Sequence, residues 1–151
     1  MALIECYECE KEISDKAPAC PHCGAPAGGK KDGVYKTYYE SGKLQRLETY
    51  KAGELDGPYK NYYENGQLEA KSTFVAGKVD GPYERYYENG QLEKKFTIVA
   101  GEPDGLFEVY YENGQLKEKG TYNMGEQCGE WIEEGDINTY PPCPPGLEDS
   151  P

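Results

Sequence analysis

The chain repeats itself every 24 residues, and this period constrains its fold more than any other feature. Residues 38–44 (YYESGKL) return as YYENGQL at 62–68, 86–92 and 110–116. An Asp-Gly pair precedes each copy, and a fifth copy begins at Cys128 and decays after Trp131. Repeats of this length are supersecondary units that bury apolar surface only by stacking on their neighbours. We therefore expect an elongated array rather than a globular core.

Each unit is expected to be a β-hairpin. Asn-Gly is the strongest two-residue hairpin turn because both positions accept a positive φ. Asn65-Gly66 and its equivalents are thus expected to form the turns, with Ser41-Gly42 as a weaker version. The register that follows pairs Tyr63 with Leu68, Asn61 with Ala70, Tyr59 with Ser72 and Gly57 with Phe74.

One face of this sheet is the expected packing face, because large side chains recur on it in every unit. Side chains alternate between the two faces along a strand. The rows on this face are Tyr35, Tyr59, Tyr83, Phe107 and Trp131; Tyr39, Tyr63, Tyr87 and Tyr111; Leu44, Leu68, Leu92 and Leu116; and Tyr50, Phe74, Ile98 and Tyr122. Mid-strand positions on it include Arg85 and Glu118, which a sealed core rarely accepts. We expect this face to be only partly covered.

The opposite face is polar except for a ladder of tyrosines. Its members are Tyr38, Tyr62, Tyr86 and Tyr110. They either pack over the stems of neighbouring lysines and glutamines or form a recognition stripe, since tyrosine clusters favour protein contacts. These four are the candidate partner-binding residues.

Two C-x2-C pairs near the N-terminus carry the strongest chemical signal. The four cysteines are Cys6, Cys9, Cys20 and Cys23. Zinc prefers four such ligands in a tetrahedron, and each pair offers two thiolates from one side. A segment this short cannot build its own core, so metal binding would supply its folding energy. We expect a structural zinc, although iron could occupy the same four thiolates.

Other readings of the cysteines are less consistent with the pattern. A redox C-x2-C normally occurs once, on a βαβ unit, and a cytoplasmic chain keeps its thiols reduced. His22, the one histidine, lies within the second pair and is expected to be a spacer. Cys128 and Cys143 are left over. We expect both to be plain thiols; a disulfide bridge between them or a second metal site is the alternative.

The charge of the chain is strongly negative. The net charge is -12, and residues 128–151 hold six acidic residues and no basic one. Such a chain repels phosphate, which disfavours nucleic acid and anionic lipid as partners. No stretch approaches the ~20 apolar residues of a membrane helix, and the N-terminus lacks the basic region of a secretory signal. We expect a cytoplasmic protein.

Both parts of the chain resemble known families. The paired cysteines, with Pro21 and Gly24, resemble the zinc-ribbon modules of many bacterial proteins. The YYENGQL units resemble the bacterial variant of the MORN repeat over about residues 32–133. Similar arrays are grouped as YwqK-family antitoxins, which are immunity-like partners of toxins. This resemblance implies an elongated antiparallel sheet that serves as a binding scaffold.

The sequence therefore predicts an all-β chain, in which a small zinc ribbon precedes an elongated antiparallel meander of β-hairpin repeats. The expected organisation is a zinc ribbon at 1–26, a linker at 27–31, a repeat array at 32–135 and an acidic, Pro-rich tail at 136–151. The tail is expected to be extended or disordered. A strap lying on the last aromatic row is the alternative.

No catalytic constellation accompanies these motifs, because the histidine lies between zinc ligands and no phosphate-cradling loop precedes a helix. We expect a non-enzymatic protein-binding module, in its most specific form an antitoxin that neutralises a basic toxin. A scaffold that docks several proteins, or self-associates through an open end strand, is the alternative. A membrane-associated MORN protein is a further alternative, which the acidic charge disfavours.

Overall fold

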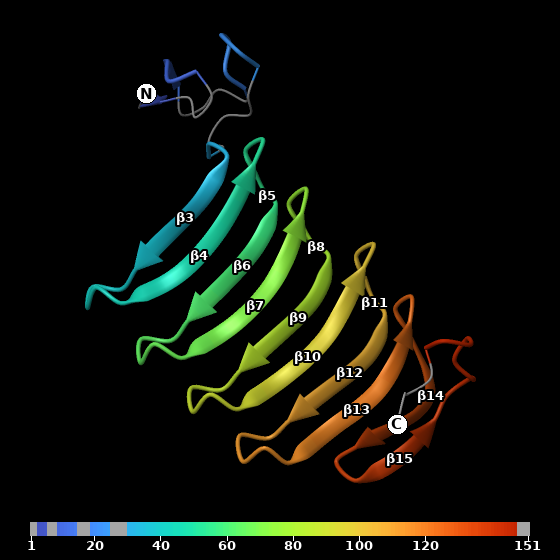
Figure 1. Cartoon of the computed structure of the whole chain (residues 1–151). Coiled ribbons are helices and arrows are strands. Elements are labelled where there is room, and N and C mark those ends of the chain that lie inside the picture. The colour runs from blue at the N-terminus through green and yellow to red at the C-terminus, as the bar shows by residue number, and fades with distance from the viewer. Residues whose placement is uncertain (1–2, 6–8, 15–18, 25–29, 148–151) are drawn as a thin grey trace.

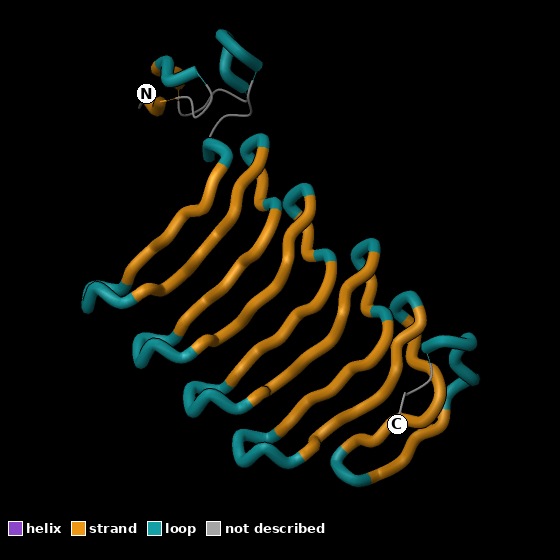
Figure 2. The backbone as a smooth tube through the Cα atoms, viewed as in Figure 1, coloured by secondary structure: helices purple, strands orange, loops and turns teal. Residues whose placement is uncertain are grey.

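The computed structural model describes residues 3–5, 9–14, 19–24 and 30–147, and these contain strands and no helix. Strands β1 (Leu3–Glu5) and β2 (Glu12–Ser14) pair with each other in the N-terminal module. Thirteen further strands form one antiparallel sheet (Figure 1, Figure 2). The prediction of an all-β chain with an elongated meander is confirmed.

Each repeat contributes one long hairpin, and three of the repeats add a short strand. The first strands of the hairpins are β3 (Gly33–Tyr38), β6 (Gly57–Tyr62), β9 (Gly81–Tyr86) and β12 (Gly105–Tyr110). The second strands are β4 (Leu44–Lys51), β7 (Leu68–Val75), β10 (Leu92–Val99) and β13 (Leu116–Asn123). The short strands β5 (Glu54–Leu55), β8 (Lys78–Val79) and β11 (Glu102–Pro103) fold back on β4, β7 and β10. Strands β14 (Glu126–Glu133) and β15 (Asp136–Thr139) end the sheet.

The tips of the hairpins differ from the predicted two-residue turn. The Tyr63 N–H donates to the Gln67 carbonyl at 2.8 Å, and the Gly66 N–H donates to the Tyr63 carbonyl at 2.9 Å. The loop is therefore three residues long, and Gly66, with a φ of 91°, is its one residue of positive φ. This geometry is a type I turn followed by a glycine bulge. Asn65 does not adopt the positive φ that a two-residue turn requires. Its side-chain Oδ1 accepts the Gln67 N–H at 2.8 Å and so stabilises the loop.

The three-residue loop shifts the register, and a bulge restores it. Tyr62 lies opposite Leu68, but Asn61 lies opposite Ala70, so Glu69 is an additional residue. The predicted pairs of the strand body are confirmed, whereas the predicted Tyr63–Leu68 pair is wrong. All four hairpins show the same shift. Residues directly opposite share a face, so the row Leu44, Leu68, Leu92 and Leu116 joins the tyrosine ladder rather than the packing face.

The two-residue turn with two positive φ values occurs at the other end of the hairpins. Ala52 and Gly53 have φ values of 50° and 80°, which define a type I′ turn. The equivalent turns are Ala76-Gly77, Ala100-Gly101, Met124-Gly125 and Glu134-Gly135. The Ala52 N–H donates to Asp32 Oδ1 at 2.6 Å, and the Met124 N–H donates to Asp104 Oδ1 at 3.0 Å. The Asp that opens a unit thus holds the turn that closes it.

The sheet is a single layer, and no second layer covers either face among the described residues. We call its packing side the aromatic face, which comprises Tyr35, Tyr59, Tyr83, Phe107, Trp131, Tyr50, Phe74, Ile98 and Tyr122. Within the sheet, the buried apolar residues are Ala70, Phe107, Cys128 and Trp131. Phe107 stacks on Trp131 with ring centroids 5.6 Å apart, so the best-buried part of the sheet lies at its C-terminal end.

The C-terminal segment extends the sheet instead of leaving it. Residues 136–139, which the sequence analysis placed in the tail, form β15, and Ile137 lies opposite Ile132 of β14. The Tyr140 ring then meets Trp131 edge-on at 6.2 Å. The described part of the tail is thus the strap on the last aromatic row. It covers a tryptophan ring that would otherwise face water at the end of the array.

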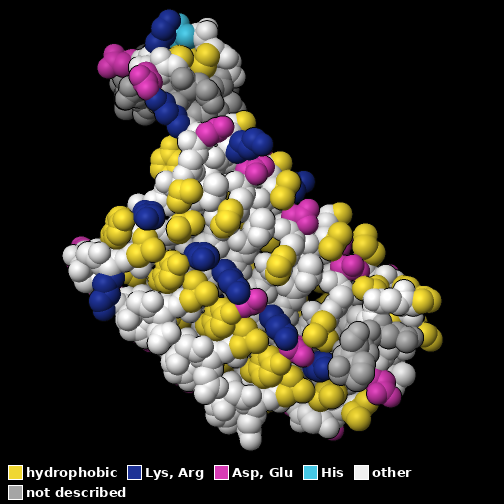
Figure 3. Space-filling model, in the orientation of Figure 1, with side chains coloured by type: hydrophobic (Ala, Val, Ile, Leu, Met, Phe, Trp, Pro, Cys, Tyr) yellow, Lys and Arg dark blue, Asp and Glu magenta, His cyan; other side chains and the backbone are white. Residues whose placement is uncertain are grey.

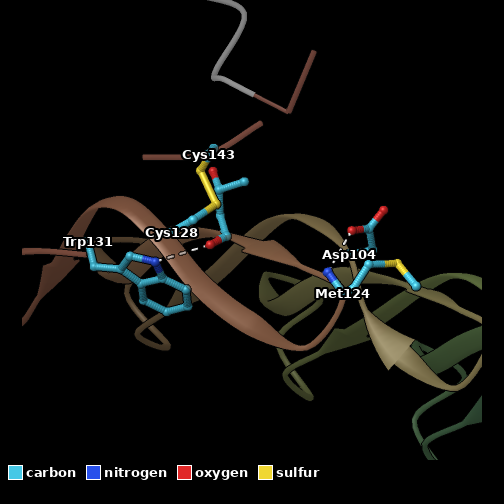
Figure 4. The surroundings of a disulfide bond; sticks show 6 residues. Asp104, Met124, Cys128, Trp131 and Cys143 are labelled. Atoms are coloured by element: carbon cyan, nitrogen blue, oxygen red, sulfur yellow. Dashed lines mark hydrogen bonds between the residues drawn. A yellow bond between two sulfur atoms is a disulfide. The ribbon is translucent and has the colours of Figure 1, made fainter. Parts of the chain in front are cut away.

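A disulfide holds this strap. Cys128 on β14 is bonded to Cys143 in the segment after β15, with their Cα atoms 5.0 Å apart (Figure 4). The expectation of two plain thiols is wrong. The bridge depends on the fold of β15, which brings the two cysteines together across 15 residues of sequence.

Gly120 makes room for the fully buried Trp131. A Cβ at Gly120 would lie far inside van der Waals contact of the indole ring. The indole Nε1 donates to the Thr121 carbonyl at 3.2 Å, which fixes the ring over the glycine. The earlier units place Glu48, Ser72 and Phe96 at this position, so the glycine belongs to the end of the array.

We expect Gly120→Ala to lower the free energy of unfolding by about 2 to 3 kcal/mol, because the methyl group must displace the ring. Urea denaturation followed by the fluorescence of Trp131, the one tryptophan, measures this directly. Ser72→Ala, at the same position of the second unit, is the matched control and should change stability by less than about 0.5 kcal/mol. An unchanged denaturation midpoint in Gly120→Ala would contradict this packing.

Candidate metal centre and interaction faces

Three of the four predicted metal ligands lie together. The Sγ atoms of Cys9, Cys20 and Cys23 are all within 4.8 Å of one another. The Cys9 and Cys20 sulfurs are 3.6 Å apart. Two sulfurs bound tetrahedrally to one zinc at about 2.3 Å would be separated by about 3.8 Å, so the cluster fits a zinc ion. Cys6, the fourth predicted ligand, lies outside the described residues.

The second cysteine pair is shaped by local hydrogen bonds. The Gly24 N–H donates to the Cys20 carbonyl at 2.9 Å, and the His22 N–H donates to Cys20 Sγ at 3.4 Å. N–H donors to sulfur stabilise a thiolate. The groups close enough to share a metal are cysteines alone within the described ranges. With Cys6, they would close a four-sulfur shell with no open position for water, which is the arrangement of a structural site.

The linker joins the N-terminal module to the first hairpin. Lys31 forms an ion pair with Glu10 of the module. Lys30 Nζ lies 2.8 Å from Glu48 Oε2 and sits over the rings of Tyr35 and Tyr50. Burial would lower the pKa of Lys30, but hydrogen bonds with Glu48 and Tyr50 outweigh it and raise that pKa. The cation thus covers the first aromatic rings of the array.

Other cations cover the aromatic face in the same way. The Arg46 guanidinium lies 5.9 Å from the Tyr59 ring centroid. Lys94 Nζ lies 5.2 Å from Phe96 and 5.0 Å from Phe107. The long stems of such residues shield apolar surface while their charges stay in water. The aromatic face is therefore packed by its own side chains, and most of its rings remain half-buried.

The other side of the sheet is organised around lysines, and we call it the lysine face. It comprises Lys36, Lys60, Lys71, Lys95, Lys119, the tyrosine ladder, and the threonines at 49, 73, 97 and 121. Two glutamates pair with the later lysines. Lys71 Nζ lies 2.9 Å from Glu84, Lys95 Nζ lies 2.6 Å from Glu108, and Lys119 Nζ lies 3.7 Å from Glu108.

The four ladder tyrosines have different surroundings. Tyr38 is 57% exposed, whereas Tyr62, Tyr86 and Tyr110 are half-buried. The Tyr86 hydroxyl donates to Glu84, and the Tyr110 hydroxyl donates to Glu108 at 2.8 Å. The last two ladder tyrosines therefore pack within the ion-pair network. A partner-binding role of the ladder stays a prediction.

The second tyrosine of each Tyr-Tyr pair has a role that the sequence analysis missed. The hydroxyls of Tyr39, Tyr63 and Tyr87 donate to the carbonyls of Tyr62, Tyr86 and Tyr110 at 2.6, 2.8 and 2.8 Å. Each bond links one hairpin to the next. Because both tyrosines recur in all four units, the repeat pattern contains a signal for such a contact.

The hollows described on the surface are small or wide open. Figure 3 shows one face, on which hydrophobic and charged side chains are interleaved over the strands. Two hollows on the lysine face measure about 230 and 200 Å³, below the ~300 to 1,000 Å³ of typical ligand pockets. A larger open hollow, about 460 Å³, is lined by Lys117, Glu118, Glu133, Glu134, Asp136 and Asn138, without a nucleophile or histidine. No helix in the described part of the chain is long and apolar enough to cross a membrane.

An uncovered, single-layer sheet of stacked hairpins defines a β-repeat protein of the interaction-module class. The chain belongs to the MORN repeat variant family, which matches residues 31–52, 55–76, 79–99 and 103–124, more than half of the chain. This family is generally non-enzymatic and mediates protein interactions. A Haemophilus influenzae protein named "Uncharacterized protein" is 40% identical over 48 residues. That match covers 32% of this chain and 63% of the relative, and its name assigns no activity.

We expect Cys20→Ser to release the metal while leaving the repeat array folded, because the cluster and Trp131 lie at opposite ends of the chain. Metal analysis of the purified full chain by mass spectrometry distinguishes zinc from iron, and Trp131 fluorescence in urea monitors the array. Cys143→Ser, which changes a cysteine outside the cluster, is the control and should retain the metal. Full metal occupancy in Cys20→Ser would contradict the thiolate assignment.

Alkaline pH should destabilise the sheet through Tyr110. Burial and the neighbouring Glu108 raise the pKa of Tyr110 to about 12, against about 10 in an unfolded chain. Between these values the unfolded state loses the proton and the folded state keeps it, so the free energy of unfolding falls as pH rises. Tyr110→Phe should flatten this fall and remove the most alkaline step of a spectrophotometric titration. An unchanged titration would show that Tyr110 is not the shifted group.

Proposed function

We propose that the chain is a non-catalytic protein-binding module that presents its lysine face to a partner and holds a structural zinc in its cysteine cluster. One observation carries the choice of face. The lysine face exposes apolar side chains in successive units: Val34 at 59%, Val75 at 50%, Val99 at 39% and Leu106 at 37%.

These side chains form a band across the sheet. Val34 lies opposite Thr49, and Leu106 lies opposite Thr121, so both share the face of the threonines. Val75 and Val99 occupy one position in consecutive units, each directly after an aromatic-face residue and hence on the other side. Clustered exposed apolar side chains mark interaction sites in soluble proteins. A flat band beside tyrosines and lysines is suited to a protein surface rather than to a small molecule.

Toxin neutralisation is the specific form of this binding that the resemblance to immunity-like arrays supports. The glutamates at the hairpin tips, Glu40, Glu64, Glu88 and Glu112, are all exposed and could steer a basic partner. In this form, a neighbouring gene product would be toxic when expressed alone and harmless when co-expressed. A cytoplasmic location belongs to this proposal. Zinc thiolates suit that compartment, whereas the Cys128–Cys143 bridge is typical of an oxidising one.

Self-association is the second candidate, and the open edges of the sheet favour it. Strands β3 and β15 each pair on one side only within the described residues. An open edge is a template for another strand. A scaffold of this kind would show concentration-dependent assembly in light scattering, whereas a partner-binding module would elute as a monomer until its partner is added.

The apolar band provides the test of the proposed function. The untagged protein is purified from its own organism, a stoichiometric companion is identified by mass spectrometry, and binding of the purified companion is measured by calorimetry. Val75→Asp combined with Val99→Asp should weaken binding at least about tenfold, because burying two carboxylates in an apolar contact is costly. Gln67→Glu combined with Gln91→Glu, which adds the same charge at exposed positions at the hairpin tips of the same two units, is the matched control. Unchanged affinity in a folded double variant would exclude this band as the binding surface.

A further inference from the structure

The charge of the lysine face is opposite to that of the chain. The two central strand positions of this face hold five lysines and two glutamates, a net charge of +3 against -12 for the whole chain. The acidic residues are concentrated elsewhere, in the tips, in the Asp-Gly pairs and after residue 128. Total charge therefore does not describe what a partner would meet on this surface, because exposed charges act over about 10 Å or less in physiological salt.

The positive charge is uncompensated at Lys36 and Lys60, on the first strands of the first two units. The two glutamates lie on the first strands of the third and fourth units and pair with Lys71, Lys95 and Lys119. Neither Lys36 nor Lys60 has a carboxylate oxygen within 4.0 Å among the described residues. Lys60 also lies directly opposite Lys71 in the sheet, and like charges in that position are destabilising. An external carboxylate at this place would relieve that repulsion.

Apolar and aromatic groups surround these two lysines. Val34 and Tyr38 are mostly exposed, on the same strand and face as Lys36. Beside Lys60, a hollow of about 230 Å³ is bounded by Pro58, Thr73 and Pro82 and by the Lys71–Glu84 ion pair, in which Lys71 neutralises the carboxylate. A small apolar side chain fits such a hollow, and a flat tyrosine supports contact at low entropic cost. The patch therefore combines two cations with places for apolar side chains.

We propose that this patch, formed by Val34, Lys36, Tyr38, Pro58 and Lys60, binds an extended acidic segment of a partner protein. The inference rests on the proposed protein-binding function and names the partner chemistry. Carboxylates of the segment pair with Lys36 and Lys60, and an apolar residue just after the second carboxylate enters the hollow, which lies between β6 and β9. A locally acidic partner differs from the basic partner expected from total charge, because contact charges decide which groups can be buried together.

The spacing of the lysines specifies the segment. Lys36 lies on β3 and Lys60 on β6, two positions apart in the order β3-β4-β6, and therefore about 10 Å apart at their Cα atoms. An extended, polyproline-like chain advances about 9 Å in three residues and returns to the same side. The preferred sequence thus has acidic residues three positions apart. Rows of acids border the patch at both hairpin ends, which disfavours a broad polyanion such as a nucleic-acid duplex.

The test uses the full-length protein and a fluorescein-labelled peptide of four Glu-Leu-Pro units, with Gln-Leu-Pro units as the neutral probe. Fluorescence anisotropy should show binding of the acidic peptide and much weaker binding of the neutral one. Lys36→Glu with Lys60→Glu should weaken binding at least about tenfold. Lys36→Met with Lys60→Met, which keeps the stems and removes the charges, should give a smaller loss in the same direction.

Lys11→Glu with Lys78→Glu is the matched control, because it changes net charge equally at exposed positions of the N-terminal module and of β8, neither of which belongs to the patch. It should leave affinity within about twofold, and Trp131 fluorescence confirms that every variant is folded. An equal loss in patch and control variants, or no binding at about 1 mM peptide, would overturn the proposal. Tighter binding of a twelve-nucleotide single-stranded DNA would replace it with nucleic-acid recognition. Retention of a genuine protein partner by the Lys36→Glu, Lys60→Glu variant would refute this patch while leaving the protein-binding function intact.

Discussion

The structure depends on the hydrogen bonds that join each hairpin to the next. In a single-layer sheet no core lies beneath the strands, so each unit is stable only against its neighbours. The strand ladders supply part of this contact. The hydroxyl of the second tyrosine, bonded to the next unit's backbone carbonyl, ties the hairpins together near their tips. Asn65 and Asn89 add a second tie, donating to the carbonyls of Glu88 and Glu112. The most constant motif of the sequence is therefore the part that stacks the units.

At each end of such an array a unit lacks one neighbour, so its aromatic rings must be covered by other side chains. At the N-terminal end, Lys30 covers the rings of Tyr35 and Tyr50 and pairs with the buried Glu48. At the C-terminal end, Trp131 takes the position that Tyr35, Tyr59, Tyr83 and Phe107 hold in the earlier units, and Tyr140 covers the tryptophan. The disulfide between Cys128 and Cys143 fastens that cover. Terminal repeats of solenoid proteins are modified in the same way to close an exposed end.

The two faces of the sheet differ in how much apolar surface they leave exposed. On the aromatic face, rings contact rings and cations cover them, so little apolar surface is left for a partner. On the lysine face, valine, proline and leucine side chains stay exposed beside ion pairs. A single layer makes this division possible, since neither face is needed to cover the other. The N-terminal cysteine module is connected to the sheet through the ion pairs of Lys30 and Lys31.

Much of the fold follows from the sequence, because a 24-residue period with glycine at fixed places leaves few alternatives to a stack of hairpins. The strand-body register, from Asn61–Ala70 to Gly57–Phe74, also follows from alternation. It was correct even though the turn was wrong, because the bulge at Glu69 compensates for the three-residue loop. The spacing of four cysteines likewise indicated a shared metal, and three of them do cluster.

Tertiary structure decided the rest, where a residue's partner lies outside its own unit. The Asn65-Gly66 pair is typical of a two-residue turn. The Asn65 side chain also bonds to the next hairpin, however, and the loop adopts the form that permits this contact. The leucine row changed face for the same reason. The tail and its disulfide hold Tyr140 against the Trp131 ring. This contact follows from the position of Trp131 at the end of the array, where no further unit packs on the ring. Local sequence determined the hairpins of this protein, and contacts between neighbouring units determined their tips, faces and ends.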